Sequence, residues 1–408
     1  MTNTMTNTMT RCTAIITLVL SPLAAHGAGF AVVEQSALAG GTGGAGVARA
    51  SDPAAAWFNP AATAGRRGLS AAAGLLVLFP GIEATAADGS FQQELTTSPR
   101  TPPHFYLSYG HGPFSGGVAV NVPFGTAVTW PDTWPGRYEA VLSELQVFRV
   151  APFVAWSFWG KIRLGVGVHV DMATLEVRRQ LDFMDTDGTM ALDLADVGVG
   201  GDASLHVDLG RMVSLGATYK SRTVLSFEGS ARFDAPLAFS KKAHDQQARA
   251  GYTLPDLLTL GVEVRPLRNL SAVLDLGLTV WSVYEQLAID FESEDTPDTA
   301  VQNDWETQLS VRTGVEYRPL SWLTLRLGMF YDPTPVPAAT LAPTSPDSDR
   351  LGFTAGLGAE LPWNLALDAF YGYVHMLGQS AENPENLRAD YAGRMQLLGF
   401  GVRFRWGG

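Results

Sequence analysis

The chain has 408 residues, of which 46% are hydrophobic, and its formal net charge at pH 7 is −12. The acidic balance excludes nucleic acid as a partner, because binding to phosphates needs clustered basic residues. The composition suits a membrane protein, yet no apolar run after residue 27 approaches the roughly 20 residues of a membrane-spanning helix, which excludes helical spans.

Residues 1–27 are predicted to be a signal peptide. Arg11 precedes an apolar core over 14–20, and a small-residue cleavage site follows at 25–27. We expect cleavage after Gly27. The one cysteine of the chain, Cys12, would leave with this peptide. The mature chain then needs no disulfide and no thiolate metal site.

The next segment, 28–66, is rich in small residues and predicts a plug packed inside a larger structure. The glycines of 40–46 follow no strand, so a nucleotide cradle is not expected; they let the segment thread a crowded space. Trp57 and Phe58 then lead into Asn59-Pro60-Ala61. Asn59-Pro60 by itself is also compatible with a simple turn.

From residue 67 onward the chain shows the two-residue period of β-strands. Ile162, Leu164 and Val166 alternate with Arg163 and Gly165, so one face is apolar and the other polar. The same alternation recurs over 272–280, 323–329 and 399–406. Strands of about ten residues with this pattern are typical of transmembrane barrels. A soluble sandwich also alternates, but it turns its apolar face inward.

The connections between strands predict how many strands the barrel has. Six are tight turns, at 111–113, 159–160, 209–210, 266–269, 319–321 and 362–364. Seven are long polar loops, centred near Asp88, Asp132, Asp187, His244, Asp298, Ser345 and Pro384. We therefore predict an all-β fold, a 14-stranded antiparallel transmembrane β-barrel over 67–408. The plug segment 28–66, which we call the hatch, would lie in its lumen.

Aromatic residues near the predicted strand ends fit the girdles at the two membrane interfaces. They are Trp130, Trp156, Trp159, Tyr219, Trp281, Tyr331, Trp363, Tyr371 and Trp406.

The sequence offers little catalytic or metal chemistry. The histidines are scattered without ligand spacing, and no nucleophile elbow or phosphate loop is present. Asp185-Thr186-Asp187-Gly188 resembles the start of a calcium loop but lacks its later ligands, so we interpret it as an acidic outer loop. We expect no cofactor, no metal, no catalytic residue and no enzymatic activity. An outer-membrane lipase and a general porin remain alternatives, although the plug argues against an open pore.

Several motifs together resemble the FadL family of bacterial outer-membrane transporters. In order along the chain they are 28–30 (Ala-Gly-Phe), 59–61 (Asn-Pro-Ala), 123–125 (Pro-Phe-Gly), 134–138 (Trp-Pro-Gly-Arg-Tyr), 254–256 (Leu-Pro-Asp), 281–282 (Trp-Ser), 303–305 (Asn-Asp-Trp), 335–337 (Pro-Val-Pro) and 346–350 (Pro-Asp-Ser-Asp-Arg). The resemblance covers nearly the whole mature sequence and includes the aromatic-hydrocarbon branch of the family.

The resemblance implies passive uptake of long-chain fatty acids or similar hydrophobic molecules. The substrate would be captured at outer loops and released laterally through a gap in the barrel wall. It also implies insertion by the barrel assembly machinery, with Trp406 near the recognised C-terminus. Outer-membrane lipid and lipopolysaccharide would surround the barrel, which we expect to be a monomer.

Residues for the gap follow from strand chemistry and from the family motifs. Pro123 cannot donate to a ladder, so we expect the strand over 117–122 to end there, and Gly125 permits a bend. Asn59, followed by Pro60 and Ala61, is expected to satisfy the groups that the break releases, as the family's Asn-Pro-Ala motif suggests.

For the substrate, the resemblance points to apolar and basic residues. Phe30, Phe124 and Trp134 are candidates for lining the channel, although such residues also form the packed interior of a folded loop. Arg178 and the adjacent Arg179 lie at the outer end of the strand that begins at Lys161, where the fatty-acid member has an arginine, and Arg178 is the first candidate for the head group. Arg137 is the second candidate. Each arginine is equally compatible with a solvated loop charge or one that faces lipopolysaccharide phosphate. Where the fatty-acid member has a lysine before the tenth strand, this chain has 303–305 (Asn-Asp-Trp), which leaves neutral hydrocarbons open as substrates.

Overall fold

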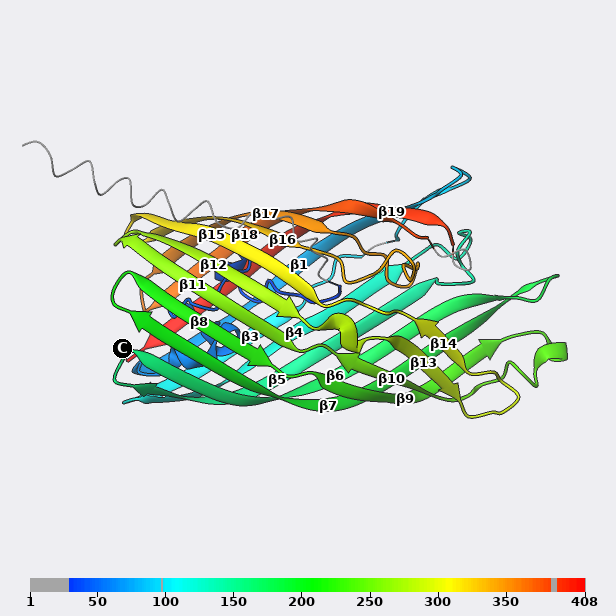
Figure 1. Ribbon diagram of the computed structural model, residues 1–408, viewed down its shortest axis with the longest axis horizontal. Coiled ribbons are helices and arrows are strands. Elements are labelled where there is room, and N and C mark those ends of the chain that lie inside the picture. Colours follow the sequence, from blue (N-terminus) through cyan, green and yellow to red (C-terminus); the bar gives the residue numbers. More distant parts are fainter. Residues whose placement is uncertain (1–28, 97, 383–386, 408) are drawn as a thin grey trace, which may run out of the picture.

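The computed structural model describes residues 29–96, 98–382 and 387–407, and its strands form one closed antiparallel sheet (Figure 1). The strands are β1 (Gly68–Ala86), β2 (Gln92–Glu94), β3 (Pro103–His111), β4 (Phe114–Thr129), β5 (Leu142–Phe158), β6 (Ile162–Asp182), β7 (Asp187–Leu209), β8 (Val213–Lys220), β9 (Thr223–Asp234), β10 (Gln246–Leu254), β11 (Leu257–Leu267), β12 (Leu270–Thr279), β13 (Gln286–Phe291), β14 (Thr299–Gln302), β15 (Gln308–Leu320), β16 (Leu323–Asp332), β17 (Arg350–Leu361), β18 (Leu365–Ser380) and β19 (Ala389–Trp406).

Some of these nineteen labelled strands are successive pieces of one longer strand. Together they make a barrel of fourteen antiparallel strands, as predicted. Five of these barrel strands are interrupted, so β2 continues as β3, β8 as β9, β10 as β11, β12 as β13 and β14 as β15. The barrel closes where β1 pairs with β19, from Leu69 opposite Trp406 to Ala86 opposite Ala389. Closure pairs both edges of the sheet, which a structure in hydrocarbon requires.

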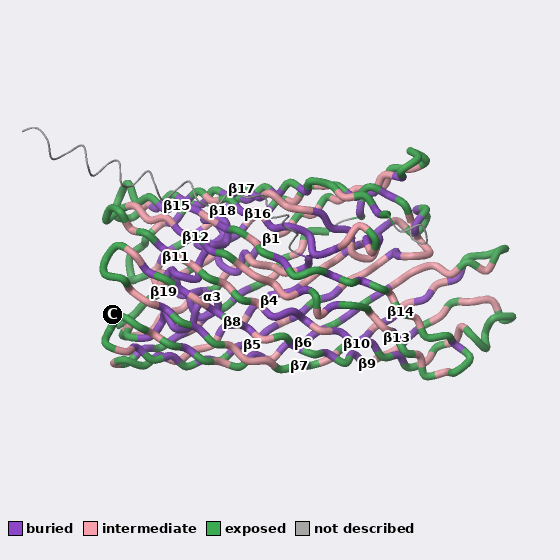
Figure 2. The backbone as a smooth tube through the Cα atoms, viewed as in Figure 1, coloured by how far each residue is buried: buried purple, intermediate pink, exposed green. Residues whose placement is uncertain are grey.

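The wall is apolar outside and polar inside, the reverse of a soluble protein. On β6, Leu164 and Val166 are 46% and 58% exposed, whereas His169 and Asp171 on the opposite face are fully buried. Figure 2 shows buried backbone running through the interior of the barrel. This arrangement excludes the soluble sandwich. Among the described residues, no helix is long and apolar enough to cross a membrane.

The six tight turns lie where they were predicted, all at the end of the barrel that carries the C-terminus (Figure 1). Short turns mark the periplasmic end of outer-membrane barrels. The predicted loop at Asp187 is wrong. β6 and β7 stay paired as far as Asp182 opposite Asp187, because the apolar alternation of both strands continues outward and keeps them in register.

Two residues assigned to the aromatic girdles are also misplaced. Trp130 and Trp281 are buried inside the structure, whereas Trp159, Trp363 and Trp406 are exposed as a girdle requires. Both buried residues lie just beyond the end of a strand, where the chain turns inward. The predicted signal peptide and part of the loop near Pro384 lie outside the described residues.

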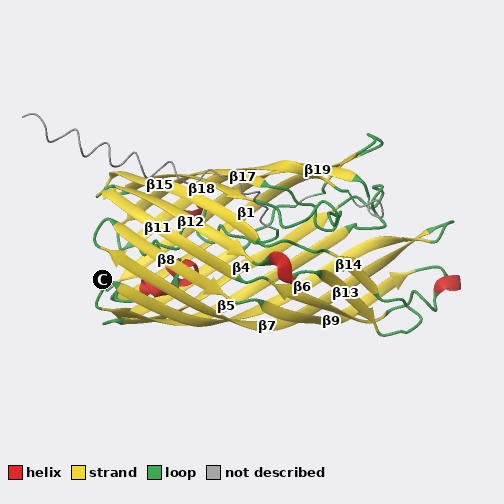
Figure 3. Cartoon of the chain, in the orientation of Figure 1, coloured by secondary structure: helices red, strands yellow, loops and turns green. Residues whose placement is uncertain are grey.

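The segment before β1 lies inside the barrel, mostly in its periplasmic half. It folds as α2 (Ala37–Gly40), α3 (Ala55–Phe58) and the 3-10 helix η1 (Pro60–Thr63), seen within the barrel in Figure 3. Nearly all of its described residues are buried. Gly43 has φ = 71°, and a Cβ atom there would lie 2.7 Å from the carbonyl oxygen of Met329. Glycine thus lets this segment touch the wall.

We predict that Gly43→Ala destabilises the protein by about 1–3 kcal/mol, because alanine is strained at positive φ and collides with β16. The thermal unfolding midpoint in detergent measures this effect. Gly251→Ala is the control, since a Cβ atom there meets nothing within 4 Å. Equal midpoints for the two variants would contradict the prediction.

Candidate functional site

The ladder between β3 and β4 breaks off part of the way along the barrel wall. β4 pairs with β3 only as far as Val120 opposite Phe105. Beyond this point the chain preceding β3 stays with β1, where Leu78 pairs with Arg100. It meets β4 again at the outer end, where the N–H of Thr96 donates to the carbonyl of Thr129 over 2.8 Å. Residues 121–128 of β4 therefore border an opening in the wall.

The N-terminal part of the hatch satisfies the backbone groups that β4 loses there. The N–H of Val32 donates to the carbonyl of Pro123 over 2.8 Å, and the N–H of Gly125 donates to the carbonyl of Phe30 over 2.9 Å. The side-chain amide of Gln35 donates to the carbonyl of Val122, also over 2.8 Å. These bonds replace the missing strand with hatch backbone.

The strand does not end at Pro123, contrary to the sequence prediction. β4 continues to Thr129, and its register against β5 shifts between Asn121 and Phe124, which is a β-bulge. Proline fits a bulge because it has no N–H to leave unpaired. The interruption falls instead on the β3 side of β4.

The other margin of the opening is rich in proline. Pro99, Pro102 and Pro103 lie in the segment that runs along β1. A residue without an N–H leaves no donor unpaired at a sheet edge. Both margins therefore reach into an apolar environment with few unsatisfied donors.

A cavity of about 380 Å³ lies behind the opening. Its apolar wall comes from β1 (Leu78, Pro80, Ile82), the proline-rich segment and β4 (Val122, Ala127, Val128). The hatch contributes Gly29, Phe30, Ala31, Val32 and Glu34. At its deep side lie Arg312, Asp332 and Arg350. We call it the lateral cavity.

A second, smaller cavity of about 90 Å³ lies towards the outer loops, and we call it the upper cavity. Apolar side chains line most of it, among them Leu175, Val177, Met190, Leu287 and Ile289. Phe30, Thr126, Leu145, Trp305 and Ser345 line both cavities. The two cavities are therefore neighbours with shared walls.

Phe30 lies at this shared wall within a cluster of aromatic rings. Its ring centroid is 4.5 Å from that of Trp281 and 5.2 Å from that of Trp305, with Tyr252 and Tyr284 beyond. Phe124 packs against it from β4 but lines neither cavity. Arg350 donates to the carbonyl of Gly29 over 2.9 Å and holds this end of the hatch in place.

Arg178 does not face a cavity, whereas the next residue does. Arg178 forms a 3.3 Å ion pair with Asp132 at the surface, because its side chain lies on the other side of β6. Arg179 lines the upper cavity, and its buried Nε atom has no hydrogen-bond partner in the part of the chain that the structure describes. Among the described residues no carboxylate forms an ion pair with Arg179. Neighbouring residues of a strand lie on opposite faces, so of these two arginines the structure turns Arg179, and not Arg178, towards a cavity.

Glu139 lines the same upper cavity from the loop between β4 and β5. Burial raises the pKa of its carboxyl group, and the N–H of Leu387, which donates to Oε1 over 2.6 Å, opposes this shift. The upper cavity thus combines apolar walls with the cation of Arg179 and the carboxyl group of Glu139, whose pKa is raised.

Trp134 and Arg137 hold the outer loops together and line neither cavity. Trp134 is buried, stacks on Trp130 with centroids 4.4 Å apart, and donates to the carbonyl of Ala140 over 2.7 Å. Arg137 pairs with Asp187 over 3.2 Å. Tyr138 also donates to Asp187, and this hydrogen bond raises the pKa of Tyr138. These residues are packed loop, the alternative that the sequence left open.

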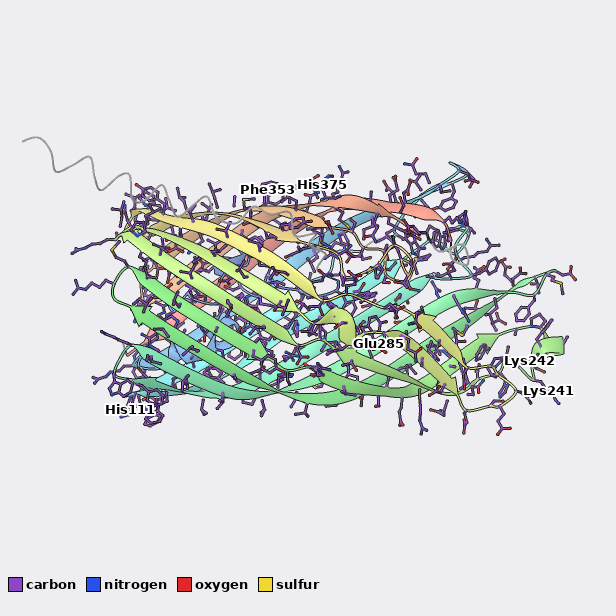
Figure 4. The ribbon with its side chains drawn as sticks, viewed as in Figure 1. His111, Lys241, Lys242, Glu285, Phe353 and His375 are labelled. Carbon is purple, nitrogen blue, oxygen red and sulfur yellow. The ribbon has the colours of Figure 1, made fainter. Side chains whose placement is uncertain are left out.

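Large apolar side chains are exposed at the outermost tip of the barrel. Met184 is 89% exposed and Leu237 is 92% exposed. Phe183 and Phe239 contact each other beside them, with ring centroids 4.6 Å apart. Figure 4 shows Lys241 and Lys242 at this tip and His111 at the opposite end.

Asn59 is not at the opening, contrary to the sequence prediction. Its side-chain Nδ2 donates to the carbonyl of Val47 over 2.8 Å and to that of Leu205 on β7 over 3.0 Å. The N–H of Ala61 donates to Ser204 Oγ over 3.0 Å, and Pro60 begins η1. The Asn-Pro-Ala motif therefore anchors the C-terminal part of the hatch to the wall.

Buried ion pairs fix the rest of the hatch. Glu34 pairs with Arg312 over 2.7 Å, and Arg312 also pairs with Asp332. Arg49 pairs with Glu316 over 3.4 Å. The sequence held no signal for these partners, because each pair joins residues far apart in the chain.

One buried cluster has the connectivity of a hydrolytic triad. His169 Nε2 lies 3.1 Å from Thr223 Oγ1, and His169 Nδ1 lies 2.9 Å from Asp202 Oδ1. Thr223 and His169 are fully buried, and the Thr223 hydroxyl donates to Asp171 over 2.7 Å. No substrate can reach this hydroxyl, so the cluster is packing within the lumen. Among the described residues no group of His, Cys, Asp and Glu could hold a metal ion.

A closed barrel with an apolar exterior, a polar interior filled by its own N-terminal segment, and an opening in its wall defines an outer-membrane transport barrel. The profile of the outer membrane protein transport protein family (OMPP1/FadL/TodX) matches residues 18–406. The chain belongs to this family, whose members carry hydrophobic compounds across the bacterial outer membrane.

Relatives and solved structures agree with this assignment. The chain is 23% identical to an outer membrane protein of Neisseria meningitidis over 86% of each chain. It is 25% identical to the long-chain fatty acid transport protein of Escherichia coli over 51% of this chain and 48% of that protein, about half of its length.

Two solved structures share the fold. A Pseudomonas aeruginosa FadL homologue superposes with a TM-score of 0.84 at 20% identity, covering 93% of this chain and 100% of that one. The P. putida toluene transporter TodX superposes with a TM-score of 0.77 at 17% identity, covering 92% and 100%.

We predict that Asn59→Ala loosens the hatch and destabilises the protein by about 1–3 kcal/mol, since the carbonyls of Val47 and Leu205 lose their donor. The ion conductance of single barrels in planar bilayers should rise as the hatch opens. Asn269→Ala is the control, because the N–H of Arg318 donates to the main-chain carbonyl of Asn269, which alanine keeps. An unchanged conductance for Asn59→Ala would contradict an anchoring role.

Proposed function

We propose that this protein takes up long-chain fatty acids, or amphipathic molecules like them, and releases them sideways into the membrane. The observation that carries this proposal is the pair of apolar-walled cavities on either side of Phe30. The lateral cavity borders the opening beside β4, and the upper cavity lies towards the outer loops. The Arg179 side chain in the upper cavity supports an anionic head group.

Capture begins at the exposed apolar tip formed by Phe183, Met184, Leu237 and Phe239. Exposed apolar patches of this kind are typical of binding sites. Lys241 and Lys242 lie beside the tip and attract anions (Figure 4). The acyl chain then moves from the tip into the upper cavity.

In the upper cavity the acyl chain packs against Leu175, Val177 and Met190, and Arg179 binds the carboxylate. An arginine with a buried, unpaired nitrogen gains most from a carboxylate, because the pair forms charge-assisted hydrogen bonds.

Passage to the lateral cavity requires Phe30 to move. Phe30 lies in the N-terminal segment of the hatch, which is hydrogen-bonded to β4 from Val32 to Pro123 and from Gly125 to Phe30. Arg350 holds the same segment at Gly29. A shift of this short segment joins the two cavities without displacing the anchored remainder of the hatch. Transport follows the concentration gradient and needs no further energy source.

Lateral exit suits the physics of an apolar cargo. Moving an acyl chain into periplasmic water would lose about 0.8 kcal/mol of favourable burial per CH₂ group. An opening towards the hydrocarbon keeps the chain out of water throughout. The filled lumen, in contrast, argues against a general porin.

We predict that Arg179→Gln weakens oleate binding by purified protein about tenfold, the loss expected for one charged hydrogen-bond partner. Binding of toluene, which has no carboxylate, should stay unchanged. Equilibrium binding of radiolabelled ligand to protein in detergent measures both. Arg178→Gln is the matched control, because Arg178 pairs with Asp132 outside the cavity.

Uptake by a host that lacks its own transporter tests the function itself. Uptake of oleate supports the proposal, whereas uptake of toluene alone would assign the protein to neutral hydrocarbons. Uptake of neither would contradict transport of either class. Equal losses in Arg178→Gln and Arg179→Gln would refute the head-group role of Arg179.

A further inference from the structure

An ion pair crosses the opening in the barrel wall. Arg100 lies on the β1 margin, where its backbone pairs with Leu78. Its Nη1 and Nη2 atoms donate to Oε1 and Oε2 of Glu144 on β5, each over 2.9 Å. β5 lies beyond β4, so the arginine side chain reaches past the stretch of β4 that does not pair with β3. Both residues line the lateral cavity.

The pair lies at the outer boundary of the apolar belt. Glu144 is on the face of β5 opposite the buried Leu145 and Val147, so it points outward. It is paired across the ladder with Glu176 of β6. The exposed apolar side chains of β6 end at Met172, before Glu176. An amphipathic molecule leaving through the opening would have its polar head at this level.

Glu144 is also in an unfavourable electrostatic position without Arg100. Directly opposed residues on one sheet face have Cβ atoms about 4.5–5.5 Å apart, and like charges there repel. Arg100 relieves this repulsion from across the opening. The guanidinium group of Arg100 binds a carboxylate through two parallel hydrogen bonds. The carboxylate of a fatty acid can accept the same two bonds.

We propose that Arg100 is the exit residue for anionic substrates, with Glu144 occupying it as an internal carboxylate while no substrate is in transit. The departing carboxylate exchanges with Glu144, so the acyl chain can pass over β4 while its charge keeps a partner. This inference rests on the proposed function and adds a specificity-determining residue at the exit. Neutral molecules pass without this exchange.

Uptake of oleate and of its neutral methyl ester by the intact protein tests the inference. Arg100→Gln should lower the rate of oleate uptake about tenfold, the factor expected from losing one charged partner. Uptake of methyl oleate and equilibrium binding of oleate to purified protein should stay unchanged, because Arg100 is outside the upper cavity. Glu144→Gln should keep oleate uptake well above that of Arg100→Gln.

Arg249→Gln is the matched control, since Arg249 pairs with Glu228 over 3.0 Å on a continuous part of the wall. Equal losses for oleate and methyl oleate, or an equal loss in Glu144→Gln, would reduce the pair to a structural brace and overturn the inference. Normal oleate uptake by Arg100→Gln would overturn the inference about Arg100 and leave the proposed function unaffected. Failure of the unmodified protein to take up oleate would overturn the proposed function as well.

A cross-link provides a second test. Cys12 is the one cysteine of the chain, so Arg100→Cys and Glu144→Cys introduce a defined pair outside the predicted signal peptide. Joining them with a bismaleimide that contains a disulfide should block uptake of both oleate and methyl oleate, and reduction should restore it. Unimpeded uptake by the cross-linked barrel would show that substrates leave elsewhere.

Discussion

The structure depends on the requirement that every backbone N–H and C=O in hydrocarbon has a partner. This requirement closes the sheet through β1 and β19, and it allows an interruption only where other groups take over. At β4 the hatch residues Phe30 and Val32 supply the missing bonds, while the prolines opposite remove donors. The hatch is therefore part of the wall at this one place, and moving it changes the wall.

Because the outside of the barrel must be apolar, the polar side chains of every strand point inward and need partners there. The ion pairs of Arg312 with Glu34 and of Arg49 with Glu316 provide them and fix the hatch. Buried charges without partners are strongly destabilising, so the hatch and the lumen depend on each other. The N-terminal end of the hatch is held mainly by backbone bonds and the Arg350 contact, which makes it the part that can move.

The proposed route places a cation at each point where an anionic head group would otherwise lose its partner. Arg179 faces the upper cavity and Arg100 crosses the opening. The acyl chain stays against apolar side chains between these points, so neither end of an amphipathic molecule is exposed to the wrong environment. In this proposal the two arginines are separate, so one acts on binding and the other on release.

The sequence by itself determined the architecture, because a two-residue period, tight turns and the lack of helical spans leave a closed barrel as the one way to pair the backbone in lipid. It also indicated the hatch and the region around Pro123. Only the tertiary structure decided which side chains meet: Arg179 faces a cavity where Arg178 had been expected, Asn59 anchors the hatch to β7, and Phe30 and Val32 bond to β4. Side chains alternate between the two faces of a strand, so an error of one residue reverses the predicted face. The other contacts join distant parts of the chain, and a local sequence pattern cannot predict them.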